Sequence, residues 1–156
     1  MRRLGLSLAA LVIVLDQLLK WWIVTVVMNP PRDIEVTSFF DLVMAWNRGI
    51  SFSLFRSDWA AGPYVWAGLA VADAIGLGWW LGRVRHALTA TALGLVIGGA
   101  LGNAIDRLRL GAVADFLDFH WQGYHWPAFN LADSAISVGI VLLVVPGLFG
   151  AREGVK

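Results

Sequence analysis

Four long stretches of apolar residues constrain the fold of this chain more than any other feature of its sequence. A helix needs about 20 mostly apolar residues to cross the roughly 30 Å hydrocarbon core of a bilayer. The stretches 4–27, 60–81, 87–105 and 129–149 meet this requirement. Because an open strand would leave its backbone groups unpaired in lipid, we expect each stretch to be a helix. The sequence therefore predicts an all-α membrane protein with four transmembrane helices, in a single integral membrane domain over residues 1–156.

The composition argues against several other classes of protein. Apolar residues make up 58% of the chain and charged residues only 15%, whereas a soluble domain is about 25% charged. These proportions disfavour a soluble domain and intrinsic disorder alike. The net charge of +1 gives no strong attraction to nucleic acid. Because the chain has no cysteine and only three histidines, we expect no metal site, and no cofactor is indicated.

The basic residues predict which side of the membrane the ends of the chain face. Arg2 and Arg3 precede the first stretch, which lacks a small-residue cleavage site and continues through Trp21 and Trp22. We therefore expect an uncleaved anchor and not a signal peptide. Four spans place both termini on one side, and the short basic pieces at the termini and between spans two and three make that side the cytoplasm. The count of basic residues is nearly balanced, so this orientation depends on their density in the short pieces.

The segments 28–59 and 107–127 are then expected on the extracytoplasmic side. In the first, Ile50, Phe52 and Leu54 alternate with serines, which is typical of a short strand with one apolar face. We expect a small β-type cradle there, lying on the membrane surface. The aromatic residues of the second segment suit the headgroup level of a bilayer.

Ionisable residues within the apolar stretches are costly in lipid, so each is a candidate for a functional role. Asp16 and Lys20 are four residues apart and share one helix face, where they can pair. This pair either stabilises the interior of a helix bundle or supports substrate or a catalytic loop. Asp73 stands alone in its stretch, and we expect a structural role in which it faces other helices or bonds a neighbouring hydroxyl group.

A block of polar residues ends the third stretch. Asn103 and Asp106 share a helix face, and Arg107 is able to hold a carboxylate with two hydrogen bonds. We expect Arg107 to lie beside Asp106 and to oppose its protonation. Asp106 is therefore predicted to position other groups and not to share a proton.

Further acids flank the start of the fourth stretch. Asp115 and Asp118 lie in an apolar setting, and Asp133 falls in the first turns of the last helix, on the same face as Asn130. One interpretation is that Asp133 only complements the helix dipole. The other is that Asp133 pairs with an upstream acid and shares one proton with it, as in aspartic-type peptide hydrolysis. Spacing alone does not decide whether the second acid is Asp106, Asp115 or Asp118.

Taken together, the polar blocks resemble those of the lipoprotein signal peptidase family, also called signal peptidase II. The blocks that carry the resemblance run along nearly the whole chain, at residues 16–20, 47–49 with Phe52, 102–107, 113–116 and 129–136. Their order, and their placement at the ends of four spans, make a chance match improbable. The resemblance implies an intramembrane aspartyl endopeptidase of the bacterial cytoplasmic (inner) membrane. It would remove the signal peptide from diacylglyceryl-modified prolipoproteins by cleaving before the lipidated cysteine of the lipobox.

The resemblance also assigns roles to residues. It implies that Asp115 and Asp133 are the catalytic pair. It implies site-lining roles for Asn103, Arg107 and Asn130, and roles in structure or substrate handling for Asp16, Lys20, Asn47 and Arg48. Membrane lipid and the cyclic peptide inhibitor globomycin are the further partners that it implies.

Two other functions remain as alternatives. The chain could be a small membrane transporter or proton-relay subunit that uses Asp16, Asp73 and Asp133 as a polar path, or a structural partner in a larger complex. A relay requires acids at several depths along one pore. Here the acids gather at the outer ends of the spans and only Asp73 lies deep, which favours the peptidase.

Overall fold

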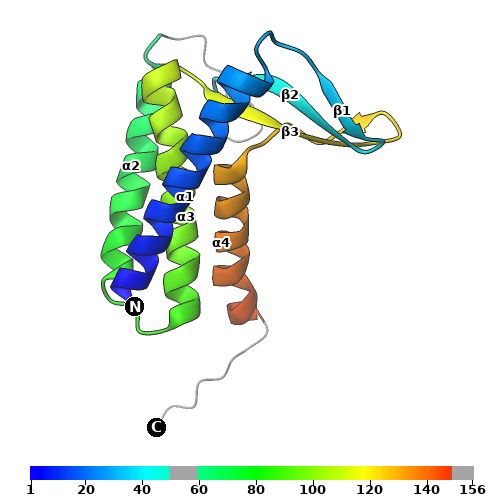
Figure 1. The fold of residues 1–156 in the computed structure, drawn as a ribbon. Coiled ribbons are helices and arrows are strands. Elements are labelled where there is room, and N and C mark those ends of the chain that lie inside the picture. Colours follow the sequence, from blue (N-terminus) through cyan, green and yellow to red (C-terminus); the bar gives the residue numbers. More distant parts are fainter. Residues whose placement is uncertain (50–59, 149–156) are drawn as a thin grey trace.

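The structure is a bundle of long helices that carries a small antiparallel sheet at one end (Figure 1). The computed structural model describes residues 1–49 and 60–148, so the strand expected at 50–54 lies outside the described residues. The helices are α1 (Arg2–Trp22), which continues as the π-helical turn η1 (Ile23–Val27), α2 (Gly62–Leu81), α3 (Ala87–Leu110) and α4 (Leu131–Leu148). The strands are β1 (Ile34–Thr37), β2 (Phe40–Asn47), β3 (Val113–Trp121) and β4 (Tyr124–His125).

Three helices are long and apolar enough to cross a membrane, within the part of the chain that the structure describes. They are Arg2–Val27, Gly62–Leu81 and Ala87–Leu110, while Leu131–Val145 is a shorter apolar helix. Many large apolar side chains on these helices are exposed, as expected where lipid replaces water as the surrounding medium. The expected number of four spans therefore stays a prediction.

Helix α3 is the centre of the bundle, since α1, α2 and α4 each pack against it. Small residues allow the close approach that membrane helices commonly use. A Cβ atom on Gly94 would lie 2.5 Å from the carbonyl oxygen of Gly5, and one on Gly98 would lie 2.8 Å from that of Ala9. The backbones of α1 and α3 are thus nearly in contact, which leaves little freedom in how their polar residues meet.

Helix α3 ends five residues later than the sequence predicts. The third stretch was expected to end at 105, where polar residues begin, but the helix continues to Leu110 and closes at Gly111 with φ +71°. Asn103, Asp106 and Arg107 are buried inside the protein, so polar residues do not end the helix there. Gly111 supplies the left-handed conformation that closes many helices.

The sheet joins the two segments that connect the spans. Its strand order is β1-β2-β3-β4, with all neighbours antiparallel. The cradle was expected from the first segment alone, but β3 of the second segment is a central strand and pairs with β2 along its length. Ala45 lies opposite Asp115 and Asn47 opposite Val113. This pairing brings residue 47 to within reach of residue 115.

Candidate active site

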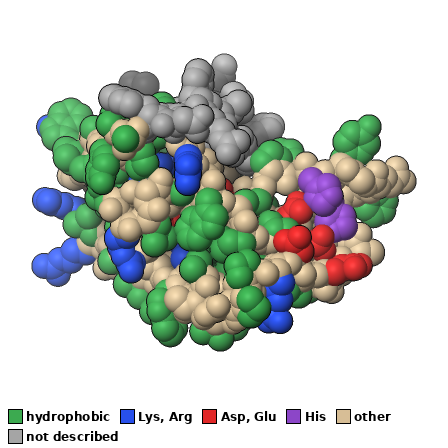
Figure 2. Space-filling view, turned by 90° about the horizontal axis from the view of Figure 1, so that it is seen from above, with side chains coloured by type: hydrophobic (Ala, Val, Ile, Leu, Met, Phe, Trp, Pro, Cys, Tyr) green, Lys and Arg blue, Asp and Glu red, His purple; other side chains and the backbone are tan. Residues whose placement is uncertain are grey.

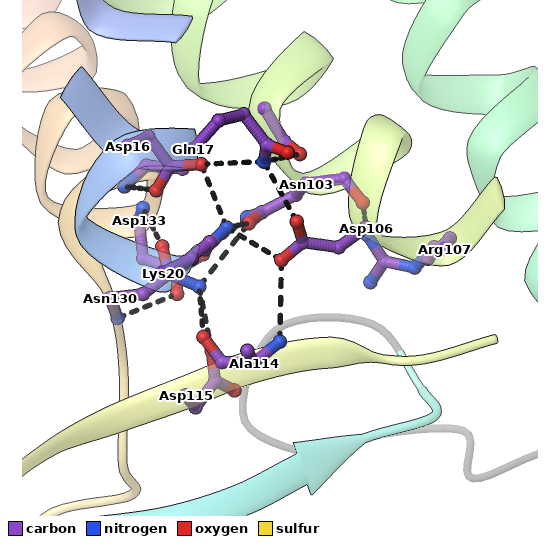
Figure 3. Close-up of polar contacts among 12 residues, drawn as sticks. Asp16, Gln17, Lys20, Asn103, Asp106, Arg107, Ala114, Asp115, Asn130 and Asp133 are labelled. Carbon is purple, nitrogen blue, oxygen red and sulfur yellow. Dashed lines mark hydrogen bonds and ion pairs between the residues drawn. The ribbon is translucent and has the colours of Figure 1, made fainter. Parts of the chain in front are cut away.

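A cluster of buried charges lies where α1 meets the end of α3; we call Asp16, Gln17, Lys20 and Asp106 the ionic cluster (Figure 3). The Lys20 Nζ lies 2.9 Å from Asp16 Oδ2 and 2.8 Å from Asp106 Oδ2. Gln17 Nε2 donates to Asp106 Oδ1 at 2.8 Å. The predicted pairing of Asp16 with Lys20 is confirmed. Gln17 was not predicted as a site residue, although its place beside Asp16 in the same polar block was an available signal.

The ionic cluster fixes two backbone segments besides the helices that carry it. Asp16 Oδ1 accepts a hydrogen bond from the Ala132 N–H at 3.0 Å, and Asp106 Oδ2 accepts one from the Ala114 N–H at 3.3 Å. Ala132 and Ala114 are the neighbours of Asp133 and Asp115. The ionic cluster therefore holds in place the chain on which those two acids are carried.

The expected contact between Arg107 and Asp106 is wrong. The Arg107 guanidinium donates instead to the carbonyl oxygens of Gly49, at 2.7 Å, and Asn103, at 3.3 Å. Successive helix residues point about 100° apart, so the side chain of Arg107 leaves α3 in a different direction from that of Asp106, which faces Lys20. Arg107 thus holds the backbone that follows β2. Arg48 is exposed, and no hydrogen bond or ion pair involves it among the described residues.

Asp115 lies on β3 with only 3% of its surface exposed. Its Oδ1 accepts a hydrogen bond from Asn130 Nδ2 at 2.7 Å, and its Oδ2 accepts one from Asn47 Nδ2 at 3.1 Å. Burial, followed in importance by the nearby Asp133 carboxylate, raises the pKa of Asp115 to about 7. The amide donors act in the opposite direction, but they carry no full charge and do not cancel the cost of burial.

Asp133 lies in the first turn of α4, where it forms a reciprocal cap with Asn130. The Asp133 N–H donates to Asn130 Oδ1 at 3.0 Å, and the Asn130 N–H donates to Asp133 Oδ2 at 3.2 Å. This is the arrangement of a capping box, with Asn and Asp in place of the more usual residue types. Asn103 Nδ2 donates to Asp133 Oδ1 at 2.8 Å. The position at the helix start that the dipole interpretation required is therefore present, together with side-chain bonds to two asparagines.

We call Asp115, Asp133 and the three asparagines around them (Asn47, Asn103 and Asn130) the amide cluster. Figure 3 labels the two acids, Asn103 and Asn130. Asn130 is bonded to both aspartates. Asn103 connects the amide cluster to the ionic cluster, because its Oδ1 accepts from Lys20 at 2.9 Å and from Asn130 at 3.2 Å. No hydrogen bond between the two carboxyl groups occurs within the described residues; Asn130 lies between the backbone segments that carry them.

Sequence spacing did not decide which of three acids, Asp106, Asp115 or Asp118, pairs with Asp133, and the structure gives the three different partners. Asp106 is paired with Lys20. Asp118 Oδ2 lies 2.7 Å from His125 Nδ1, on the arm of the sheet where Figure 2 shows histidine and acidic side chains together. Asp115 alone shares a hydrogen-bonding residue, Asn130, with Asp133.

A cavity of about 610 Å³ adjoins the amide cluster. Polar groups of Asn47, Asn103, Arg107 and Asp133 lie at one part of its lining. The remainder is mainly apolar and comes from α2, α3, α4 and the start of β3: Trp66, Leu69, Ala70, Ala72, Gly76, Leu77, Val96, Ala100, Ile136 and Val113, with Asp73 as the exception. The acids therefore adjoin a space that suits an apolar ligand. Within residues 1–49 and 60–148, no group of three potential metal ligands is placed to hold a metal ion.

Asp73 does not bond a neighbouring hydroxyl group among the described residues, and the structural role expected for it stays a prediction. Its side chain is exposed, lines this cavity, and has no hydrogen bond or ion pair among the described residues. Asp16, in contrast, is enclosed by Lys20 and Gln17. Asp16 is connected to Asp133 through Lys20 and Asn103, and Asp133 shares the cavity with Asp73. Because Asp73 itself is not bonded, no continuous chain of hydrogen bonds joins all three acids in the described structure.

Comparison with known proteins identifies close relatives. The signal peptidase (SPase) II family profile matches residues 8–149. The lipoprotein signal peptidase of Beijerinckia indica subsp. indica is 44% identical over 155 residues, which cover 99% of this chain and 93% of the relative. That of Ralstonia nicotianae is 48% identical over 150 residues, covering 95% and 86% of the two chains.

Solved structures agree with this result. A bacterial membrane enzyme determined by the in meso method at 2.3 Å resolution superposes with a TM-score of 0.79 at 26% identity, covering 97% of this chain and 94% of that one. A second, determined by the same method at 1.9 Å resolution, gives a TM-score of 0.76 at 27% identity. The bundle and its sheet are therefore shared by these membrane enzymes.

Proposed function

Because this chain belongs to the signal peptidase II family, we propose that it cleaves prolipoproteins by an aspartic mechanism in which Asp115 and Asp133 are the catalytic pair. Family membership makes it a protease that removes signal peptides from lipoproteins, and a multi-pass protein of the bacterial inner membrane. Its substrate is then a prolipoprotein. The proposal adds the catalytic groups, the cleavage position and the orientation.

The observation that carries the proposal is the double attachment of Asn130. It donates a hydrogen bond to Asp115 through its side chain and exchanges two with Asp133 through its backbone and side chain. One residue thus fixes the mutual placement of two acids that are 18 positions apart in sequence. The groups that bond the two carboxyls are neutral amides, which leave a shared proton available for transfer.

The chemistry requires one carboxylate and one carboxylic acid at the same time. In our proposal the carboxylate takes a proton from a water molecule as the water oxygen attacks the scissile carbonyl carbon. The carboxylic acid gives its proton to the carbonyl oxygen, and collapse of the tetrahedral intermediate returns a proton to the leaving amine. A pKa of about 7 for Asp115 supports the presence of a neutral acid at physiological pH. The pair is best described by two apparent pKa values that belong to both residues together.

The proposal also covers the cleavage position and the place where the enzyme meets its substrate. We propose that the enzyme cuts before a cysteine that already carries a diacylglyceryl group, as the family resemblance implies. Each buried methylene is worth about 0.8 kcal/mol, so such a substrate stays in the bilayer and has to be met there. The mainly apolar cavity beside Asp133 and Asn103 supports this route. The cyclic peptide globomycin is expected to bind at the same place.

The orientation is likewise part of the proposal. Four spans with both termini in the cytoplasm would place the sheet and the amide cluster near the outer face, where water reaches the acids. The sheet would then lie at the membrane surface, and segment 28–59 would cover the substrate, with strand addition as the means of holding an extended peptide. Residues 1–156 would act as one domain.

The experiment uses purified protein in detergent with a diacylglyceryl-modified lipobox peptide. We expect wild-type protein to release the signal peptide. We expect Asp115→Asn and Asp133→Asn to lose this activity while thermal melting shows that both variants remain folded. Asp118→Asn is the matched control, since Asp118 lies on β3 as Asp115 does but is bonded to His125 of β4, and it is expected to cleave normally. Normal cleavage by either of the first two variants would remove that residue from the catalytic pair.

A further inference from the structure

Asp73 is the only charged residue of α2. Its exposed side chain lines the cavity that also holds Asp133 and Asn103. No hydrogen bond or ion pair involves it in the part of the chain that the structure describes. An acid without a companion in a membrane helix is expensive, and such residues face a bundle interior or a cavity and mark a functional pathway. We therefore expect its hydrogen-bonding partner to be a polar group of the ligand that occupies the cavity.

The depth of Asp73 follows from the antiparallel packing of α2 and α3. Helix α2 ends at Leu81 and α3 begins at Ala87, and the two helices run side by side in opposite directions (Figure 1). Asp73 lies eight residues before the end of α2, and Asn103 lies sixteen residues after the start of α3. At about 1.5 Å per residue, Asp73 lies roughly 12 Å, or two helical turns, further into the bundle than Asn103. Asn103 is bonded to Asp133, so Asp73 lies about two turns below the proposed catalytic pair.

The surroundings of Asp73 on α2 are apolar. Its neighbours one turn away on that helix are the cavity residues Leu69, Ala70, Gly76 and Leu77. A carboxyl group in such a place gains most from one hydrogen bond to a polar group that enters the cavity, because water competes weakly there. The structure thus offers a single polar contact point on an otherwise apolar wall.

We infer that Asp73 is a specificity-determining residue, which hydrogen-bonds a hydroxyl-bearing side chain of the signal peptide four to eight residues before the scissile bond. This inference rests on the proposed function: a peptide bond cut near the outer face leaves the N-terminal side of the signal peptide deeper in the membrane, and we place that side in the cavity. A distance of about 12 Å corresponds to about four residues of extended chain and about eight of helix. The range of four to eight covers both forms of the bound peptide.

The test compares peptides that differ by one oxygen atom. Diacylglyceryl-modified lipobox peptides carry alanine or serine at one position, from the fourth to the eighth, before the scissile bond. We expect the wild-type enzyme to prefer serine at one of these positions by about threefold to tenfold in kcat/KM, mainly through KM, which is the size of one hydrogen bond net of the bond to water that it replaces. Asp73→Leu removes this preference, and Asp73→Asn keeps it because an amide also bonds a hydroxyl group.

Controls separate this inference from folding and from the proposed function. Ile75 lies on the same helix with 68% of its surface exposed, so Ile75→Leu is expected to keep the serine preference. Asp73→Leu makes α2 more apolar and does not hinder its insertion into a bilayer. An absence of preference in the wild type, or a preference that persists in Asp73→Leu, would overturn the inference while cleavage itself upheld the proposed function. Failure to cleave any of the peptides would overturn both.

Discussion

The ionic cluster and the amide cluster lie next to each other and are built from the same acidic residue type, but they differ in what bonds the acids. In the ionic cluster one ammonium group, that of Lys20, contacts two carboxylates at 2.8 and 2.9 Å. In the amide cluster the side chains that bond the two carboxyls are asparagines. A fixed positive charge holds an acid as a structural anion, whereas a neutral donor leaves it free to gain and lose a proton. The difference predicts that one cluster supports the fold and the other the chemistry.

The largest effect is expected when the acids of the amide cluster lose their ability to transfer a proton. Asp115→Asn and Asp133→Asn keep the size of the side chain but not its acid chemistry. We expect kcat to fall by roughly 1,000-fold or more with little change in melting temperature. Single-turnover cleavage of the lipopeptide measures the first and thermal melting the second. A melting temperature that falls in step with the activity would contradict the division between the clusters.

The next effect concerns the ionic cluster. Lys20→Met leaves Asp16 and Asp106 buried without their ammonium group, and breaking a buried ion pair from one side costs about 3–5 kcal/mol. We expect a large loss of folded protein in detergent, measured by thermal melting and by protease resistance. Arg85→Met, which removes a positive charge from an exposed position, is the matched control and is expected to melt as the wild type does. Equal melting of the two variants would show that the ionic cluster does not stabilise the fold.

A smaller effect is expected from Asn130→Ala, which acts on the connection between the two acids. It removes the helix cap, worth about 1 kcal/mol, and the hydrogen bond to Asp115. We expect a modest drop in melting temperature but a fall in kcat of about tenfold to 100-fold, because the mutual placement of the acids is relaxed. Ser134→Ala is the control, since the Ser134 hydroxyl bonds the Asn130 carbonyl oxygen and neither carboxyl group of the pair. A kcat unchanged in Asn130→Ala would mean that this connection is not needed for catalysis.

The smallest effect is that of pH. Asp115 has a pKa of about 7 in the folded protein against 3.8 for an unperturbed aspartate. The folded state therefore keeps a proton between those values that the unfolded chain releases, so stability is expected to fall as pH rises from about 4 through 7. The cleavage rate is also expected to fall as the acid form is lost, by about tenfold between pH 6 and pH 8.

Melting temperatures and kcat/KM values over pH 5 to 8 test both parts of this prediction. Asp115→Asn is the control for stability, because it removes the titrating group and should flatten the change in melting temperature. A wild-type melting temperature that rises over this range would contradict a raised pKa of Asp115 in the folded protein. A cleavage rate that does not change with pH would count against a shared proton.

The long-range hydropathy and the local spacing of residues were sufficient to predict much of this structure. Apolar length predicted the helices, and the spacing of Asp16 and Lys20 predicted their ion pair, because both signals are contained within one element. The resemblance, and not the spacing, selected Asp115 as the companion of Asp133. The assignment of catalytic roles remains a prediction.

The features that sequence reasoning missed depend on contacts between distant parts of the chain. Strand β3 is buried along most of its length, so its sequence does not alternate in the way that reveals a strand. Its partner β2 lies in the other connecting segment, and Asn47 meets Asp115 across 68 positions. Arg107 meets the carbonyl oxygen of Gly49, 58 positions away, while Asp106 meets Lys20 of α1. The access of Asp73 to the cavity depends on the placement of α2 and α4 around α3. None of these is contained in a local pattern.

The pairing of β2 with β3 also limits which length changes this family of sequences can accept during evolution. Asn47 and Asp115 are diagonal neighbours on one face of the sheet, and side chains alternate between faces along a strand. Deleting a single residue from Phe40–Asn47 would rotate the asparagine to the opposite face and withdraw its amide from Asp115. Insertions at residues 38–39, between β1 and β2, would leave that alignment untouched. Related chains should therefore vary in length at the hairpin tip and keep a constant count between the tip and the asparagine.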